Sequence, residues 1–549
     1  MSSVATLALI SLLALPAISI ALSVLFQRIS RLNNFAALPI LMAAGLAWLA
    51  TWVLRGQVFE GVLGGWSPVS LTASPLILAS FTPGAAVVIA WVSVHGLRLL
   101  QRGDAPDTAN DTVNDAEHLL EVFVITGLAL AAFANSATAL LVGLGLVDGL
   151  SFVAALLARD KSRTVALHLL LNGASLVLLT AVFALHLGQG NTAPSGSAYF
   201  PLMRIGDYLQ PFADAVLFLR CATAPLLSPS QENSPHWRAS SCATLLLMAH
   251  LPALGLGAHS TWLLAVLVFS GLLAAGLACI NESHSRALPI LNIAAFYGAA
   301  ASAASGQASA IAAAGVAWLL GYPLLQSSLN QPAPFNRTAQ VARLFGAAAW
   351  VGLPLTVGFV GQAGIAAVLA ERGGLGWLAL VGWVIGLALF AAATLRIALA
   401  PMPMQLALGL DVNTARWNWR SAATFAPLLV LMGMIVGFGL LPQLLGATGL
   451  NQPVARNGLA GWVTWLLAVV AGVAVWWYEE RWQLRLGAWR NTIEKAINLN
   501  WLREIWSGAT ERLARPFRLI FPFLESDGAL LWAIILVLLV ALVTRPGGP

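Results

Sequence analysis

The chain has 549 residues, of which 59% are hydrophobic and 9% charged, and its mean hydropathy is +0.82. These values exclude a soluble globular protein and indicate a polytopic membrane protein. The net charge of +6 does not indicate a nucleic-acid partner, because the basic residues are scattered over short loops. Apolar stretches recur from Leu7 to Val543, and the sequence predicts an all-α protein with about 14 transmembrane helices.

The N-terminal part is expected to hold helices at about 5–27, 35–54 and 74–97. The first is a retained helix rather than a signal peptide, since Arg28 and Arg31 follow it instead of a cleavage site. Basic residues recur in every second loop, which places those loops in the cytoplasm and the N-terminus outside. The acidic stretch 101–117 predicts a solvated loop, with a partner-docking site as the alternative.

An acid and a base follow in apolar sequence. Helices are expected near 119–136, 137–158 and 164–188, and the second carries Asp148 near mid-depth. Arg220 lies in the apolar run 213–228, in which Pro225 would break a helix. Ionisable residues at such depth commonly mark an ion path. The alternative is a buried ion pair that only locks two helices together, and the sequence leaves both open.

The next region begins with a polar break at 229–238. Glu232 and His236 are four residues apart, but Pro235 between them argues against a shared helical face and a metal site. Helices are predicted near 241–257, 261–280, 287–303 and 309–325. The span 341–370 contains Pro354 and several glycines, which indicates a discontinuous helix of the kind found in transporters with inverted repeats. Simple helix packing explains such glycines equally well.

The C-terminal part begins with a helix that carries Arg396, followed by helices near 422–445 and 458–478. Basic residues then alternate with tryptophan and leucine over 479–527, which predicts an amphipathic segment at the membrane surface. A last spanning helix covers 528–544. The three cysteines lack the spacing of zinc or iron-sulfur sites, and no phosphate loop or nucleophile triad is present. We therefore expect no metal, no cofactor and no enzymatic activity of the chain itself.

From the third helix to the end, this order of features resembles the antiporter-like subunits of the complex I superfamily. In that family a glutamate on the fifth helix pairs with a lysine on a broken seventh helix, and a basic residue on a broken twelfth helix completes a polar axis. Asp148 stands at the place of the glutamate, and Arg220, in Arg-Cys-Ala-Thr-Ala-Pro-Leu, at that of the lysine. The run from Ser234 to Thr244 is similar to Thr-Pro-Val-Ser-Ala-Leu-Ile-His without its histidine.

Three further positions carry the resemblance. Asn281 to Asn292 is similar to the family's Asp-x-Lys-Arg-x-x-Ala segment, with Arg286 at the arginine. Leu-Pro-Leu-Thr-Val-Gly-Phe-Val-Gly-Gln362 is similar to Leu-Pro-Leu-x-x-Gly-Phe-x-x-Lys, with glutamine in place of lysine. Arg396 fits an arginine of the following helix. The resemblance implies two inverted five-helix repeats within six segments: 1–118, 119–257 (first repeat), 258–398 (second, degenerate repeat), 399–478, 479–527 and 528–549.

The substitutions change the chemistry that the resemblance implies. Arginine keeps its proton under essentially all conditions, so Arg220 cannot carry protons, and neither can Gln362. Either protons cross by Asp148, water and histidines such as His168 and His250, or transport has shifted to a partner subunit. The candidate ion-translocation residues are Asp148, Arg220, His168, His250, Arg286, Gln362 and Arg396.

Within the superfamily, the short chain and eroded relay look more like the DabB type. That resemblance implies a subunit of the cell inner membrane that conducts protons or sodium. It would power inorganic carbon uptake together with a soluble, zinc-containing DabA-like partner that hydrates CO2. The alternative is a structural or proton-translocating subunit of a complex I-like or hydrogenase-like respiratory complex, with other membrane subunits as partners.

Overall fold

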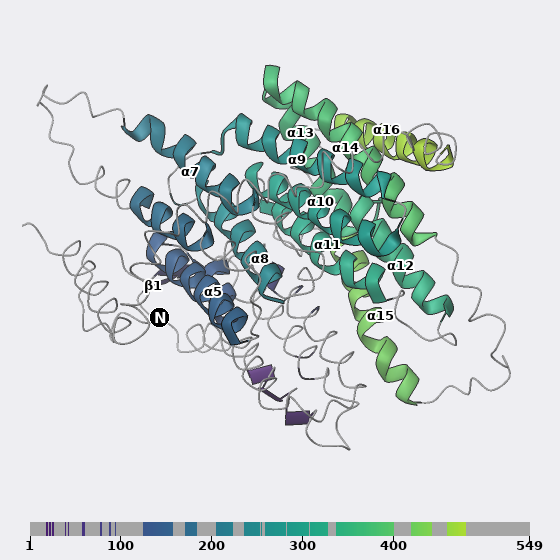
Figure 1. Cartoon of the computed structure of the whole chain (residues 1–549), viewed down its shortest axis with the longest axis horizontal. Helices are drawn as coiled ribbons and strands as arrows, with labels where there is room; N and C mark the ends of the chain where they lie inside the picture. The colour runs from purple at the N-terminus through teal and green to yellow at the C-terminus, as the bar shows by residue number, and fades with distance from the viewer. Residues whose placement is uncertain are drawn as a thin grey trace, which may run out of the picture. The chain divides into compact units, whose positions relative to one another are not determined.

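A computed structural model defines the helices of the central part of the chain (Figure 1). Its described residues divide into a main unit, Met1–Gly65 with Ser74–Trp477, and a second unit, Trp66–Ala73 with Tyr478–Pro549, of which only Tyr478 is described. The predicted segments 479–527 and 528–549 lie outside the described residues. The structure describes residues 124–134, 136–157, 171–183, 205–222, 235–252, 254, 258–281, 283–306, 308–327, 336–399, 419–441 and 458–478, strands 58–60 and 77–79, and scattered positions between 18 and 94.

The described part of the chain is almost entirely helical, as the sequence predicts. Residues 124–132 and 171–183 are also helical. Three of the described helices, Thr261–Ile280, Arg286–Ala304 and Gly374–Ala398, are long and apolar enough to cross a membrane. The labelled helices are α5 (Ala137–Leu157), α7 (Ile205–Ala222), α8 (Pro235–His250), α9 (Thr261–Ile280), α10 (His284–Ala304), α11 (Ala308–Ser327), α12 (Asn336–Val351), α13 (Val357–Glu371), α14 (Gly374–Ala398), α15 (Trp419–Leu440) and α16 (Gly458–Trp477).

Two helix predictions need correction. The single helix predicted over 74–97 is wrong, because Ile77–Ala79 forms strand β2, which pairs antiparallel with β1 (Val58–Glu60). Pro83 and Gly84 interrupt this stretch in the sequence, and both residues disfavour a helix interior. The helix predicted over 241–257 instead runs from Pro235 to His250. Proline is favoured in the first turn of a helix, where its missing N–H would have no partner.

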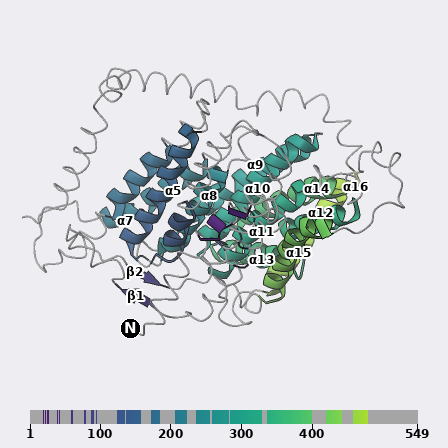
Figure 2. The same ribbon diagram turned by 90° about the horizontal axis from the view of Figure 1, so that it is seen from below.

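The described helices pack in two groups. α8 contacts both α5 and α7, and the three helices lie side by side in Figures 1 and 2. In the later part of the chain, α9 packs along α10 and α14, and α14 packs along α16. Small residues allow these close approaches: a Cβ added at Gly386 of α14 would lie 3.3 Å from the backbone of Leu272 in α9. This is the usual means of helix association in lipid.

The discontinuity predicted around Pro354 is confirmed. α12 ends at Val351 and α13 begins at Val357. Between them the backbone is left-handed at Gly352 (φ +73°) and at Leu355 (φ +71°), a conformation that glycine adopts freely and leucine rarely. The Thr356 hydroxyl stabilises the break by donating a hydrogen bond of 2.7 Å to the Leu353 carbonyl. In the Arg220 helix, α7 ends at Ala222, three residues before Pro225.

The packing of α13 against the end of α12 depends on Gly358. A methyl group at this position would collide with the carbonyl oxygen of Ala349. We expect Gly358→Ala to destabilise the protein by about 1–3 kcal/mol, because the backbone must move to admit the methyl group. Thermal melting of the full chain in detergent measures the change. Gly433→Ala in α15 is the matched control, since nothing lies within 4 Å of its added Cβ. Equal melting of both variants would contradict this packing.

Candidate functional site

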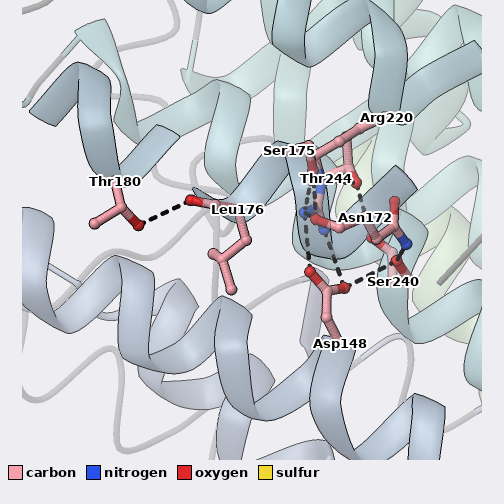
Figure 3. A network of polar contacts seen from close by, with 8 residues as sticks. All are labelled: Asp148, Asn172, Ser175, Leu176, Thr180, Arg220, Ser240 and Thr244. Atoms are coloured by element: carbon pink, nitrogen blue, oxygen red, sulfur yellow. Dashed lines mark hydrogen bonds and ion pairs between the residues drawn. The ribbon is translucent and has the colours of Figure 1, made fainter. Parts of the chain in front are cut away.

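Asp148 and Arg220 form a buried ion pair between α5 and α7 (Figure 3). Arg220 Nη1 donates to Asp148 Oδ2 at 2.9 Å, and Nη2 donates to Oδ1 at 3.1 Å. The two parallel bonds give the fork geometry that makes arginine-carboxylate pairs strong. Asp148 is 6% exposed and Arg220 2%, and Asp148 lies near the middle of the 21-residue α5. The structure therefore brings together the two residues singled out from the sequence.

Polar groups of two other helices surround the Arg220 guanidinium. Its Nε donates to the Thr244 hydroxyl of α8 at 3.2 Å, and Nη1 donates to the Ser175 hydroxyl at 3.0 Å. Thr244 in turn donates to the Ser240 carbonyl at 2.9 Å, and Ser175 to the Asn172 carbonyl at 2.6 Å. All three guanidinium nitrogens therefore donate hydrogen bonds, which offsets the loss of water around a buried charge.

The Asp148 carboxylate receives one more hydrogen bond. The Ser240 hydroxyl donates to its Oδ1 at 3.2 Å, and the Asn172 amide donates to the Ser240 oxygen at 2.7 Å. Figure 3 shows these side chains converging on the pair from α8 and from the helix 171–183. Three donors, two of them from Arg220, therefore contact this one carboxylate. Since arginine stays protonated, Asp148 is the member of the pair that can gain or lose a proton.

The residues that complete this network were not predicted from the sequence as site residues. Asn172 and Ser175 are three positions apart on one helix, and Ser240 and Thr244 are four apart on α8. These spacings put each pair of polar side chains on one face of its helix. That signal was available in the sequence, but small polar residues in apolar helices also serve helix packing. Only the position of Arg220 between the two faces shows that they belong to one site.

The other candidates do not join this network. His250 lies near the end of α8, where its Nε2 is 3.1 Å from the carbonyl oxygen of Ala132. Arg286 is exposed in the first turn of α10. Arg396 caps the C-terminus of α9, donating to the carbonyls of Ala278 at 2.7 Å and of Asn281 at 2.6 Å. His168 lies outside the described residues.

Gln362 of α13 occupies a different environment. Its amide nitrogen is 3.4 Å from the Trp350 carbonyl, and its Oε1 is buried without a hydrogen-bond partner. It borders a pocket lined by residues of α9, α10, α11, α12, α13 and α14. The lining is mostly apolar and includes Ala314, Trp318 and Gly361. Among the described side chains, no group of three or more His, Cys, Asp and Glu residues could hold a metal ion.

Comparisons with known proteins identify the fold. No protein-family model matches the chain, and no curated protein matches it in sequence. Solved structures do match in three dimensions. A chain of the Mrp complex from Dietzia sp. DQ12-45-1b superimposes with a TM-score of 0.67 at 16% identity, over 100% of this chain and 64% of that longer chain.

Two further structures agree. A chain of the membrane-bound sulfane sulfur reductase (MBS), an archaeal respiratory membrane complex, gives a TM-score of 0.61 at 14% identity, covering 96% of this chain and 99% of its own. A chain of respiratory complex I from Thermus thermophilus gives 0.54 at 16% identity, covering 84% and 99%. The chain is thus a multi-pass membrane protein with the fold shared by these chains of the Mrp, MBS and complex I assemblies.

Proposed function

We propose that the chain is a proton- or cation-conducting subunit of an energy-coupled membrane complex, with Asp148 as its titrating group and Arg220 as a fixed counter-charge. The observation that carries the proposal is the buried, bidentate pair near the middle of α5. Charges at such depth are rare unless they serve an ion path, because the membrane interior disfavours them. The shared fold supports the proposal, since all three matched chains come from membrane assemblies.

Protonation of Asp148 would change the balance of charge in the site. Ionised Asp148 neutralises Arg220, whereas neutral Asp148 leaves a permanent cation inside a low-dielectric region. Thr244 and Ser175 keep the guanidinium in place in both states, because they contact nitrogens directly. The arrival of a proton would therefore repel other cations nearby and favour their movement. The pair can therefore take part in coupling, although Arg220 itself neither releases nor accepts a proton.

The wider assignment rests on the sequence resemblance. It comprises about 14 spanning helices with two inverted repeats and the six predicted segments. The complex would reside in the cell inner membrane and take up inorganic carbon. A soluble, zinc-containing DabA-like partner would carry out the chemistry, and this chain would be no enzyme. His168, His250, Arg286 and Arg396 remain candidates for the path beyond Asp148.

The second candidate function is a structural or proton-translocating subunit of a complex I-like or hydrogenase-like respiratory complex. The surroundings of Gln362 favour a structural role. Where the resembling family has a lysine, this chain has an uncharged amide beside a mostly apolar pocket. Arg396 likewise holds helix-terminal carbonyls. A scaffold would retain the Asp148–Arg220 pair only to lock α5 to α7.

Removing the charge of Asp148 distinguishes a role in ion conduction from a role that only holds α5 to α7. We expect Asp148→Asn to abolish ion flux and to destabilise the protein by about 3–5 kcal/mol, because Arg220 is left buried without its anion. The double variant Asp148→Asn/Arg220→Gln should recover stability, since no unpaired charge remains, but not flux. Flux is measured with a pH-sensitive dye in inverted membrane vesicles that contain the full complex, and stability by thermal melting.

Ser151→Ala is the matched control on the same helix. The Ser151 hydroxyl is buried without a hydrogen-bond partner, so its removal should leave flux and melting unchanged. If the double variant conducts like the wild type, the pair is a lock between helices and the conduction proposal is wrong.

Inorganic carbon as the transported substrate needs its own test. We expect a carbonic-anhydrase-deficient bacterium that carries this gene and its neighbouring partner gene to grow in ambient air and to take up labelled bicarbonate. An uncoupler and Asp148→Asn should each abolish uptake, because transport would draw on the ion gradient through Asp148. Absence of uptake with the wild-type chain would point instead to the respiratory complex.

A further inference from the structure

A second buried acid lies on the same helix as Arg220. Asp214 of α7 is fully buried, six residues before Arg220. Its Oδ1 accepts hydrogen bonds from the Gln210 amide at 3.1 Å and faces His259 Nδ1 at 2.8 Å. Its Oδ2 accepts the Ser260 backbone N–H at 2.8 Å and also contacts the Ser260 hydroxyl. Both carboxylate oxygens are therefore engaged, and the closest charged partner is a titratable histidine rather than an arginine.

The contacts of His259 define how many protons this pair holds. Its Nε2 lies 2.9 Å from the Met248 carbonyl, which can only accept, so Nε2 carries a hydrogen. Its Nδ1 faces Asp214 Oδ1, and one proton must lie between them to form the bond. Without that proton, a carboxylate would face the lone pair of a neutral ring in a buried site. The pair therefore binds one exchangeable proton in a defined place.

The pair contacts two helix ends. Met248 lies in the last turn of α8, whose carbonyls lack intrahelical partners, and His259 donates to one of them. Asp214 accepts from the N-cap residue of α9. A cation at a helix C-terminus and an anion at an N-terminus are both stabilised by the helix dipoles. At the C-cap of α13, the Arg372 guanidinium donates to the His259 carbonyl at 2.7 Å and adds a positive charge beside Asp214.

The position of the pair relates it to Asp148. α9 has 20 residues and is about 30 Å long, close to the thickness of the hydrocarbon core, so its N-cap Ser260 lies near one membrane boundary. Asp214 is bonded to this end, whereas Arg220 is about 9 Å farther along α7 and contacts Asp148 near mid-depth. Gln210 Oε1 is buried without a hydrogen-bond partner and offers an acceptor for water next to Asp214.

We propose that Asp214 and His259 form a second proton-binding site, in series with Asp148 between one membrane boundary and the Asp148–Arg220 pair. The proposal rests on the proposed conduction through Asp148. A hydronium ion at the boundary gives its proton to the Nδ1–Oδ1 position and leaves as water, and the pair changes from one net negative charge to neutral. The proton then passes to water on the side of Arg220 and reaches the Asp148 carboxylate. His259 thus supplies the titratable base that Arg220 cannot be.

The test replaces His259 by a residue that keeps its bond but cannot titrate. In His259→Asn the amide nitrogen can still donate to Asp214. We expect flux in the vesicle assay to fall about tenfold or more, since histidines and acids are the usual proton carriers in membranes. His284→Asn, in the first turn of α10 at the other end of α9, is the matched control and should conduct like the wild type. Thermal melting of each variant in detergent reports on folding.

A second readout does not depend on conduction. In the full chain labelled with ¹⁵N-histidine, the signals absent from His259→Asn belong to His259. We expect both of its nitrogens to be protonated at neutral pH, and the Nδ1 signal to move on titration and to change in Asp214→Asn. A His259 ring that stays singly protonated across the titration would overturn the proposal, even if His259→Asn fails to fold.

The outcomes separate the two proposals. Loss of flux in both Asp148→Asn and a well-folded His259→Asn supports both. Wild-type flux in His259→Asn together with loss in Asp148→Asn overturns only the second proton site. Wild-type flux in Asp148→Asn overturns the proposed function and with it the path that this site would serve.

Discussion

The pairing of one buried carboxylate with one buried guanidinium constrains how α5 and α7 are arranged. An unpaired charge at this depth would destabilise the protein by several kcal/mol, about 3–5 for a broken buried pair. Asp148 and Arg220 therefore hold α5 and α7 in a fixed relation, and the hydroxyls of Ser175 and Thr244 hold the neighbouring helices to the same centre. The same requirement makes the pair sensitive, because one proton on Asp148 alters the charge of the whole network.

Polar side chains also contact both ends of α9. At its N-terminal end, Asp214 accepts the backbone N–H of Ser260, and His259 bonds a carbonyl of α8. At its C-terminal end, Arg396 donates to several carbonyl groups. Both ends satisfy backbone groups that a helix leaves open. At the N-terminal end, two titratable side chains, Asp214 and His259, contact each other.

The later helices contain a break beside an uncharged polar side chain. α12 and α13 are separated by a break at Gly352 and Leu355, the feature that frees backbone groups in discontinuous helices. The side chain that follows this break is Gln362, beside a mostly apolar pocket. Arg372, at the end of α13, contacts the carbonyl of His259. Arg372 therefore links the end of α13 to the Asp214–His259 pair.

The sequence alone determined the membrane class, the helical fold, the break near Pro354 and the presence of Asp148 and Arg220 in apolar sequence, because hydropathy, proline and a charge in an apolar run act locally. It did not reveal Asn172, Ser175, Ser240 and Thr244 as one site, nor that Asp214 and His259 meet. These contacts join residues that are 24 to 92 positions apart. Only the tertiary structure decides them, because helical periodicity fixes the face on which a side chain lies but not the helix that this face meets.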